Sequence, residues 1–367
     1  MFTIANVRPV GQNVGNQAIH FSLKHLVNQA FGRLVSIIDY PSSRLPGDSG
    51  VCGITRESVN EMNRFADGVI VGGGNLFENG SLLVDTEALG ALNPPLMLFS
   101  NSWGRTYDRF DNLQERSDSI SSNDLHALVT RADISLSRDS ATHNLLGSMG
   151  LIDELGLCPT IGLSNFSASF PPLPPGEEVG ALISIRTPQL MNVSARHQRR
   201  IPDIIDTVID QLRAAGFQRV RVLCNDKRDL DFATLFKQSK QVDTVFTSDV
   251  YEYLSTLSNA DFLFSFRLHA TLPAISLGVP VVNVSYDERA SSLISDLGVE
   301  AADINLIEKG DVFEEAVKEK ISAGGFRSDA SLEKKWEQGF KNQAVAMGRF
   351  RSLVVDYLTS ETSLAKL

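Results

Sequence analysis

Apolar and polar positions follow two different periods along this chain. Short runs of β-branched and other apolar residues are separated by stretches whose apolar residues recur at helical spacing. The stretch after the first run shows the helical spacing clearly, with apolar side chains at Ile19, Leu23, Leu26, Val27 and Ala30. Such residues form one stripe on a helix. Strands that alternate with helices in this way are typical of βαβ units that build a parallel sheet.

The pattern predicts two sets of five strands. The first set covers residues 2–7, 34–39, 68–71, 96–100 and 134–137. The second set covers residues 179–185, 219–223, 243–246, 261–265 and 281–284. We therefore expect an α/β protein with two doubly wound, Rossmann-like domains, an N-terminal domain at 1–166 on the acceptor side and a C-terminal domain at 179–330 on the donor side.

Two further segments complete this division. The sequence SASFPPLPPGEE at 167–178 contains four prolines, which exclude a helix or a central strand, so we interpret it as the linker between the domains. A long helical pattern at about 332–358 lies in the last segment, 331–367, and no strand follows it. We expect this C-terminal helix to pack back across the domain junction.

Length and charge narrow the picture. The chain has 367 residues, and a single hydrophobic core rarely serves more than about 250 to 300 residues. A formal net charge of -10 speaks against broad binding to nucleic acid, which requires clustered positive charge. Any anion site must therefore be local.

The cysteines and the apolar runs indicate the cellular compartment of the protein. Cys52, Cys158 and Cys224 have no metal-ligand spacing and leave one thiol unpaired in any disulfide scheme. The start of the chain lacks a signal-peptide pattern, and no apolar run reaches the roughly 18 residues of a membrane span. We expect a cytoplasmic protein without a membrane span, an essential metal or a cofactor.

Unusual polar clusters follow the predicted strands. In open parallel sheets, ligands bind beyond the carboxyl ends of the strands. GQNVGNQA, GGGN and SNSWG follow the first, third and fourth strands, and Arg186, FRLH and SYDER follow strands of the second set. If the two domains face each other, these loops line one cleft. The candidates for binding an acceptor or an anion in the first domain are Asn13, Gly15, Asn16, Gly73, Gly74, Asn75, Ser102 and Trp103.

Several of these clusters also have a purely structural interpretation. GGGN lacks both the GxGxxG pattern of dinucleotide-binding folds and the lysine of a P-loop, so it and GQNVGN are compatible with simple turns. In SRDS after the fifth strand, we favour Asp139 as a helix N-cap with Arg138 as its salt-bridge partner. Arg138 is therefore left out of the candidate site.

FRLH is the most informative cluster. Arg267 and His269 are two residues apart, so an extended backbone would place both side chains on one side. A guanidinium beside a titratable imidazole at a strand exit favours an anionic ligand, and a core histidine with a paired arginine is the alternative.

A second basic cluster is ARHQRR at 195–200, just before Pro202, which we expect to start a helix. Cations at a helix N-terminus oppose its dipole. The cluster is therefore either a solvated loop or a site for an anionic ligand.

Several segments resemble the polysaccharide pyruvyltransferase family. They are NVGNQAI, VGGGNLF, ISLSRDSATHNLLGSMG, ISIR, and FRLHATLPAISLGVPVVNVSYDERASSLISDLG. The last segment is the most specific, because R-x-H, G-V-P and Y-D-x-R keep both identity and spacing. Two positions depart from the family: Asn16 stands where an aspartate is usual, and Arg289 where a lysine is usual.

The resemblance implies a fold similar to the glycosyltransferase B architecture, with phosphoenolpyruvate as donor and a saccharide, free or linked to a lipid or nucleotide, as acceptor. The product would be a pyruvate ketal in a cell-surface or extracellular polysaccharide. By position, His269 and Arg267 resemble the catalytic residues, with His269 as proton donor. Arg186, Arg267, Arg289 and Tyr286 resemble the donor-binding residues.

Two other functions remain open from the residues alone. The same architecture serves glycosyltransferases that use a nucleotide sugar, since an arginine can bind a diphosphate. A non-catalytic sugar-binding protein would also fit, given Asn16. The sequence identifies neither the acceptor sugar, nor the ketal stereochemistry, nor the oligomeric state, and a homo-oligomer is compatible with it.

Overall fold

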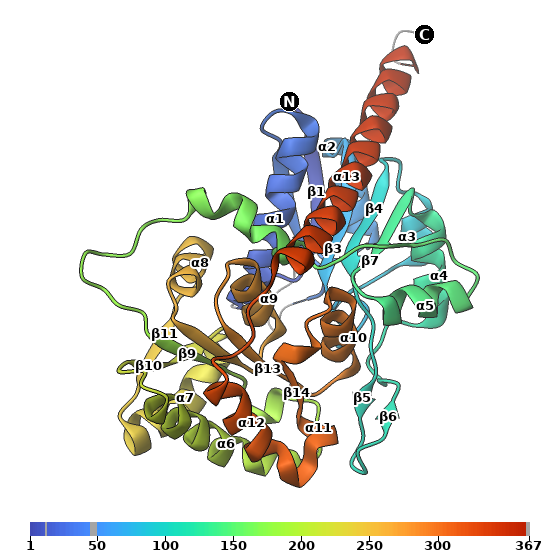
Figure 1. The fold of residues 1–367 in the computed structure, drawn as a ribbon. Helices are drawn as coiled ribbons and strands as arrows, with labels where there is room; N and C mark the ends of the chain where they lie inside the picture. Colours follow the sequence, from blue (N-terminus) through green and yellow to red (C-terminus); the bar gives the residue numbers. More distant parts are fainter. Residues whose placement is uncertain (12, 45–49, 365–367) are drawn as a thin grey trace.

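The computed structural model describes residues 1–11, 13–44 and 50–364. Gln12 of the motif GQNVGNQA and residues 365–367 of the predicted C-terminal segment lie outside the described residues. The described chain forms two six-stranded parallel sheets with helices on both faces of each (Figure 1). The predicted α/β architecture is confirmed, and all ten predicted strands overlap strands of the structure.

The first sheet has the strand order β2-β1-β3-β4-β7-β8, and all neighbours are parallel. Its strands are β1 (Thr3–Arg8), β2 (Ser36–Pro41), β3 (Gly68–Gly74), β4 (Leu96–Asn101), β7 (Ile134–Ser137) and β8 (Glu154–Leu155). The helices that connect these strands are α1 (Val14–Phe31), α2 (Arg56–Phe65), α3 (Thr86–Gly90), α4 (Ser122–Arg131) and α5 (Ser140–Ser148).

The second sheet has the order β11-β10-β9-β12-β13-β14 and is also parallel throughout. Its strands are β9 (Ala181–Ile185), β10 (Val220–Cys224), β11 (Asp243–Phe246), β12 (Phe262–Ser265), β13 (Val281–Ser285) and β14 (Asp303–Asn305). Its helices are α6 (Ala195–Ala214), α7 (Leu230–Lys240), α8 (Val250–Ser258), α9 (Leu268–Ser276), α10 (Glu288–Leu297), α11 (Leu306–Lys309) and α12 (Phe313–Ser322).

Short 3-10 helices complete the connections. They are η1 (Pro159–Ser169), η2 (Pro188–Leu190), η3 (Lys227–Asp229), η4 (Glu300–Ala302) and η5 (Gly310–Val312). The proline-rich stretch 171–180 contains neither helix nor strand, whereas residues 167–169 still belong to η1. The predicted domain limit at 166 lies before this connection and the limit at 179 lies near its end, and both stay a prediction.

Alternation along the strands gives each sheet two buried faces. In β1, Ile4 packs with α1 on one face, while Ala5 and Val7 pack with α2 on the other. The start of α1 also packs against the second domain, because Val14 and Ala18 share a core cluster with residues of α9. The two domains therefore meet through buried apolar side chains.

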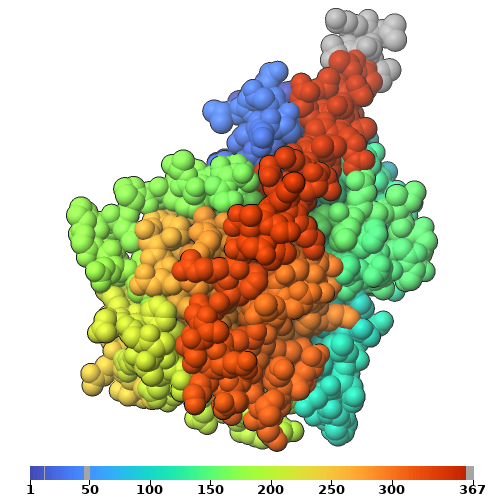
Figure 2. Space-filling model, in the orientation of Figure 1, coloured from blue at the N-terminus to red at the C-terminus, as the bar shows by residue number. Residues whose placement is uncertain are grey.

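The last helix, α13 (Ala330–Leu364), packs back across the junction, as predicted. Near its start, Trp336 belongs to a core cluster of the second domain and donates its Nε1 proton to the carbonyl of Leu297 at 3.0 Å. About four turns further along, Phe350 and Val354 pack on the first sheet. In Figure 2 this helix forms the red ridge that runs from the orange surface up towards the blue segment.

A hairpin absent from our sequence prediction forms a second connection between the domains. Its strands are β5 (Thr106–Tyr107) and β6 (Leu113–Gln114), and it extends from the first domain along the second (Figure 1). At its base, Arg105 forms a salt bridge with Glu288 of α10.

The helix predicted to start at Pro202 begins earlier, and that prediction is wrong. Ser194 is the N-cap residue of α6, and Pro202 lies inside the helix. The three arginines of ARHQRR therefore lie in the first two turns of a helix rather than in a loop.

Candidate active site

A cavity of about 480 Å³ lies between the carboxyl ends of the two sheets. Each sheet reverses its strand order once, between β1 and β3 and between β9 and β12. Ligands of open α/β sheets bind at these switch points, and here both contribute to one cavity. The lining residues are Pro9, Asn13, Asn16, Asn75, Asn79, Ser81, Arg138, Arg186, Gln189, Leu190, Asn192, Asn225, Arg228, Phe266, Arg267, Leu268, His269, Asn283, Val284, Tyr286, Asp287, Arg289 and Ala290.

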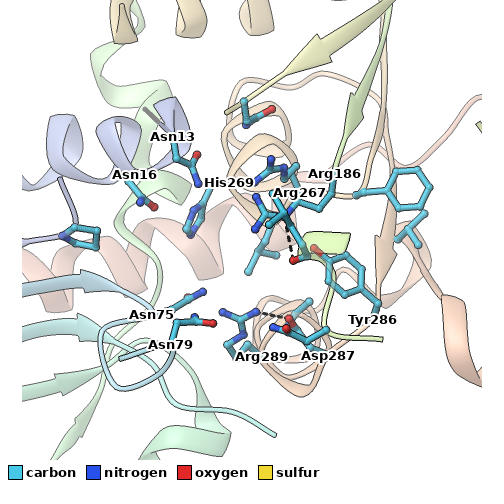
Figure 3. A pocket seen from close by; sticks show the side chains of 18 of the residues that line it. Asn13, Asn16, Asn75, Asn79, Arg186, Arg267, His269, Tyr286, Asp287 and Arg289 are labelled. Carbon is cyan, nitrogen blue, oxygen red and sulfur yellow. Dashed lines mark hydrogen bonds and ion pairs between the residues drawn. The ribbon is translucent and has the colours of Figure 1, made fainter. Parts of the chain in front are cut away.

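Amides dominate the first-domain side of the cavity (Figure 3). Asn13 is the N-cap residue of α1, and its Oδ1 accepts a hydrogen bond from the Gly15 backbone N–H at 3.0 Å. The Oδ1 atoms of Asn75 and Asn79 accept hydrogen bonds from arginines. All three partners can only donate, which fixes the orientation of each amide. The Nδ2 groups of these asparagines are therefore left to donate to a ligand.

Arg138 lines the cavity, although it is not among the candidate residues from the sequence. It follows β7 and is 1% exposed. Its Nη1 lies 3.1 Å from His269 Nε2, and its Nη2 donates to Asn75 Oδ1 at 2.8 Å and to Ser102 Oγ at 2.6 Å. Asp139 is the N-cap residue of α5, as predicted, but its predicted pairing with Arg138 is wrong. The position of an arginine directly after a strand is the signal that could have identified it.

His269 lies in the first turn of α9, with Arg267 as the N-cap residue. The two side chains therefore share the cavity because a helix begins between them, not because the backbone is extended throughout. Since arginine only donates, His269 Nε2 accepts from Arg138 and the neutral ring carries its proton on Nδ1. Burial, followed by the positive charges of Arg138, Arg289 and Arg267, holds the pKa of His269 well below its usual range. Without a ligand, the ring is neutral.

Two arginines of the second domain are already paired with carboxylates. Arg267 forms a buried salt bridge with Asp229 and donates from Nε to the carbonyl of Ile185 at 3.0 Å. Arg289 pairs with Asp287, and its positive charge is therefore largely compensated.

Arg186 is less compensated. Its Nε donates to the carbonyl of Leu190 at 3.3 Å. Its Nη1 donates to no hydrogen-bond acceptor, and the Asp226 carboxylate oxygen lies 4.0 Å away. Burial and the neighbouring Arg267 lower the pKa of Arg186 to about 10. A bound anion would favour the charged form of Arg186 and so oppose both influences on its pKa.

The remaining predicted residues have different surroundings. Tyr286 lines the cavity. Gly73 packs against the backbone of β4 and the side chain of Ile19, and neither Gly73 nor Gly74 lines the cavity. Ser102 supports Arg138, and Trp103 packs against the core of the first domain outside the lining.

The basic cluster at the start of α6 lies outside the lining. Arg200 donates to Glu314 Oε1 at 2.9 Å, and the exposed Arg196 is 3.5 Å from Asp311. His197 Nε2 lies 3.0 Å from Asp111 of the β5–β6 hairpin. The structure therefore favours neighbouring carboxylates as the partners of this cluster.

Two facing parallel sheets with one cavity between their switch points define an α/β protein of the glycosyltransferase B architecture. Solved structures share this fold. A UDP-GlcNAc 2-epimerase from Methanocaldococcus jannaschii, in complex with UDP-GlcNAc and UDP, has a TM-score of 0.54 and 12% identity, covering 92% of this chain and 99% of its own. One from Neisseria meningitidis, bound to UDP-GlcNAc, has a TM-score of 0.56 and 10% identity, covering 98% and 100%.

The chain belongs to the polysaccharide pyruvyl transferase family, whose sequence profile matches residues 13–288. The matched region includes the residues that line the cavity except Pro9, Arg289 and Ala290. Comparison with curated protein sequences gave no match. The low identity of the structural relatives limits that likeness to the fold.

Proposed function

We propose that this protein transfers the enolpyruvyl unit of phosphoenolpyruvate to two hydroxyl groups of a saccharide and forms a pyruvate ketal. One observation carries the proposal beyond the family. Arg138 and Arg186, one from each domain, line the cavity that contains His269, and each has a buried guanidinium nitrogen without a hydrogen-bond partner, Nε and Nη1 respectively. Two such cations suit a small donor with two anionic groups.

Phosphoenolpyruvate has such a pair of groups, a carboxylate and a phosphate. With one group near Arg186 and the other near Arg138, the donor would span both domains and place its reacting carbons beside His269. In this arrangement Arg267, held by Asp229, contributes a fixed positive charge to the second-domain side. The asparagine Nδ2 groups of the first domain would donate to oxygens of the donor or the acceptor.

In the proposed reaction, His269 donates a proton to C3 of the donor, which makes C2 electrophilic. A saccharide hydroxyl adds to C2 and loses its proton. The bond between C2 and the phosphate oxygen then breaks, and a second hydroxyl adds and loses its proton to close the ketal. One of the two hydroxyl protons replaces that of His269, and the released phosphate takes up the other.

The donor itself would prepare His269 for this role. Its negative charges oppose the fields of Arg138, Arg267 and Arg289, which lower the pKa of His269 in the empty cavity. An oxyanion also offers Arg138 another acceptor, so that His269 Nε2 becomes free to take up a proton. General acid catalysis of this kind typically contributes about 10² to 10⁴ in rate.

We infer a saccharide acceptor from the family. Its attachment to a lipid or a nucleotide stays a prediction. A cytoplasmic location, a homo-oligomer and independence of cofactors and metals also stay predictions. Among the described residues, no helix is long and apolar enough to cross a membrane.

Phosphate release from phosphoenolpyruvate, measured against a panel of glycosides with mass spectrometry of the products, tests the proposal. We expect a product with the mass of a pyruvate ketal for at least one glycoside with a suitable pair of hydroxyls. The structural relatives bound to UDP-GlcNAc make this nucleotide sugar the matched control. Transfer from a nucleotide sugar, with no phosphate released from phosphoenolpyruvate, would overturn the proposal in favour of a glycosyltransferase.

A further inference from the structure

Glu78 is a buried carboxylate that the proposed reaction does not use. It lies four residues beyond the end of β3, next to the cavity residue Asn79, and is 0% exposed. Neither of its carboxylate oxygens accepts a hydrogen bond. Burying a charged carboxylate without hydrogen bonds is costly. We therefore examine the charges around Glu78 for a function that explains its position.

The nearest cation belongs to the other domain. Glu78 Oε2 lies 3.4 Å from Arg289 Nη1, across the gap between the sheets. Arg289 reaches this point because Gly104, in a first-domain loop, has no side chain: a Cβ atom there would lie 2.4 Å from Arg289 Cγ. Arg289 also pairs with Asp287 at the start of α10. One cavity arginine is therefore shared by two buried carboxylates, one from each domain.

Charged groups face Glu78 from three elements. Arg289 and Asp287 face it from α10, and Arg138 from the end of β7. Arg116 faces it from the segment after the hairpin, with its Nε 3.9 Å away, while Arg116 also pairs with Asp118. Burial is the largest influence on the pKa of Glu78. Arg289 and, less strongly, Arg116 and Arg138 lower this pKa, and Asp287 raises it, so that together these influences raise it to about 7.

The proposed donor requires more positive charge than the empty cavity offers. A carboxylate and a phosphate whose second pKa is about 6 together carry nearly three negative charges at neutral pH. Among the described residues, no carboxylate oxygen lies closer than 4.0 Å to the guanidinium of Arg138 or Arg186, so these two arginines supply unpaired cations. Arg289 lines the same cavity and would be a third, if one of its two carboxylates were neutral.

We propose that Glu78 is a positioning residue for the donor site: as a carboxylate it holds Arg289 against the first domain, and when it takes up a proton it releases Arg289 to bind a donor oxyanion. The inference rests on the proposed function, since the oxyanion is that of phosphoenolpyruvate. The proton comes from solvent and is released when the donor leaves. Donor binding is thus linked to proton uptake.

Calorimetric binding of phosphoenolpyruvate at several pH values tests this role. For a group that titrates near pH 7, the wild type loses about tenfold in affinity at pH 8 relative to a variant that needs no proton. Glu78→Gln, which is permanently neutral, should therefore bind the donor about tenfold more tightly than the wild type at about pH 8 and equally well at about pH 6. The difference between the two proteins cancels the titration of the donor itself.

Proton uptake and a conservative variant complete the test. In buffers of different ionisation enthalpy, the wild type should take up more protons on binding than Glu78→Gln at about pH 7.5. Glu78→Asp, which keeps the carboxylate, should keep the pH dependence. Equal pH dependence of donor binding in the wild type and Glu78→Gln would overturn the role of Glu78.

If Glu78→Gln does not fold, Arg116→Gln is the variant to measure instead. This variant removes a cation that favours the charged form of Glu78, so the pH at which donor affinity declines should move upwards. An unchanged pH dependence would again overturn the role. Absence of phosphoenolpyruvate binding to the wild type at every pH is a separate outcome, which would overturn the proposed function together with this role.

Discussion

Gly15 and His269 belong to different domains but lie so close together that a Cβ atom on Gly15 would be 2.6 Å from the Cβ atom of His269. Gly15 is the second residue of α1, held by the N-cap Asn13, and the preceding Val14 N–H donates to the carbonyl of Asn225 in the second domain at 2.9 Å. The start of α1 therefore helps to fix the position of the proposed acid.

Gly15→Ala should lower turnover strongly while the protein still folds. The added methyl group must displace His269 or the start of α1, and a misplacement of about 1 Å at a reacting group can lower the rate by roughly 10²-fold. We expect the free energy of unfolding to fall by only about 1 to 3 kcal/mol. Gly90→Ala is the control, because nothing lies within 4 Å of the added atom. If Gly15→Ala is fully active and its crystal structure shows no displacement of α1, then turnover does not depend on the close packing of Gly15 against His269.

Arg138→Met and Arg186→Met should each weaken binding of phosphoenolpyruvate. Each removes a charge-assisted hydrogen bond worth about 1.5 to 3 kcal/mol, which corresponds to roughly 10- to 100-fold in the dissociation constant. Isothermal titration calorimetry measures the dissociation constant for phosphoenolpyruvate. Arg196→Met is the control, since Arg196 is exposed and lies outside the cavity lining. Donor affinity unchanged in both cavity variants would show that these arginines do not bind the donor.

The stability of the protein should fall as the pH is lowered through the window set by His20. Burial is the main cause that lowers its pKa to about 4, with Arg8 as the next and Asp39 opposing. The unfolded chain takes up the proton near pH 6.5, whereas the folded protein does not until about pH 4. The contribution is therefore fully present above about pH 6.5 and lost progressively towards about pH 4.

Urea unfolding across this range checks the effect of His20. The variant His20→Gln should lose less unfolding free energy than the wild type between about pH 7 and 5. If both proteins lose the same amount, other groups account for the acid sensitivity.

Phe350→Ala should destabilise the whole protein, because α13 connects the two domains. Phe350 is 0% exposed and packs closely against Gly68 of the first sheet, where a Cβ atom would lie 2.8 Å from Phe350 Cζ. We expect a loss of about 3 to 5 kcal/mol in the free energy of unfolding. Val345→Ala on the same helix is the control, since Val345 is 64% exposed. A similar small effect of both changes would show that α13 contributes little to stability.

Periodicity and strand-end rules were sufficient for the main architecture. Buried parallel strands are continuous apolar runs, so β4 and β12 stand out from the sequence alone. The two-residue strands β5, β6 and β8 were missed because so short a segment shows no period. Proline favours the first turn of a helix, so the sequence predicts a start of α6 at Pro202, whereas the helix begins after Ser194 and continues through Pro202.

The candidate site was predicted in part. The rule that ligands lie at strand ends located Asn13, Asn75, Arg186 and His269, all of which line the cavity. Arg138 was missed because its neighbour Asp139 offered a local salt bridge, whereas its actual partners are far away in sequence. Nor could the sequence show that Arg289 is already engaged by Asp287 and Glu78, since that depends on how the two domains approach each other.

The destination of the proton tests the central proposal most directly. If His269 protonates C3 of phosphoenolpyruvate, a reaction in heavy water must place solvent-derived deuterium in the methyl group of the pyruvate ketal, because the imidazole exchanges its proton with solvent before each turnover. His269→Gln, which keeps a hydrogen-bond donor but is no acid near neutral pH, should still bind the donor and lose most of the rate. Deuterium in the ketal methyl of the wild-type product together with a nearly inactive His269→Gln enzyme is the predicted result. A ketal methyl without deuterium, or a fully active His269→Gln enzyme, would contradict it.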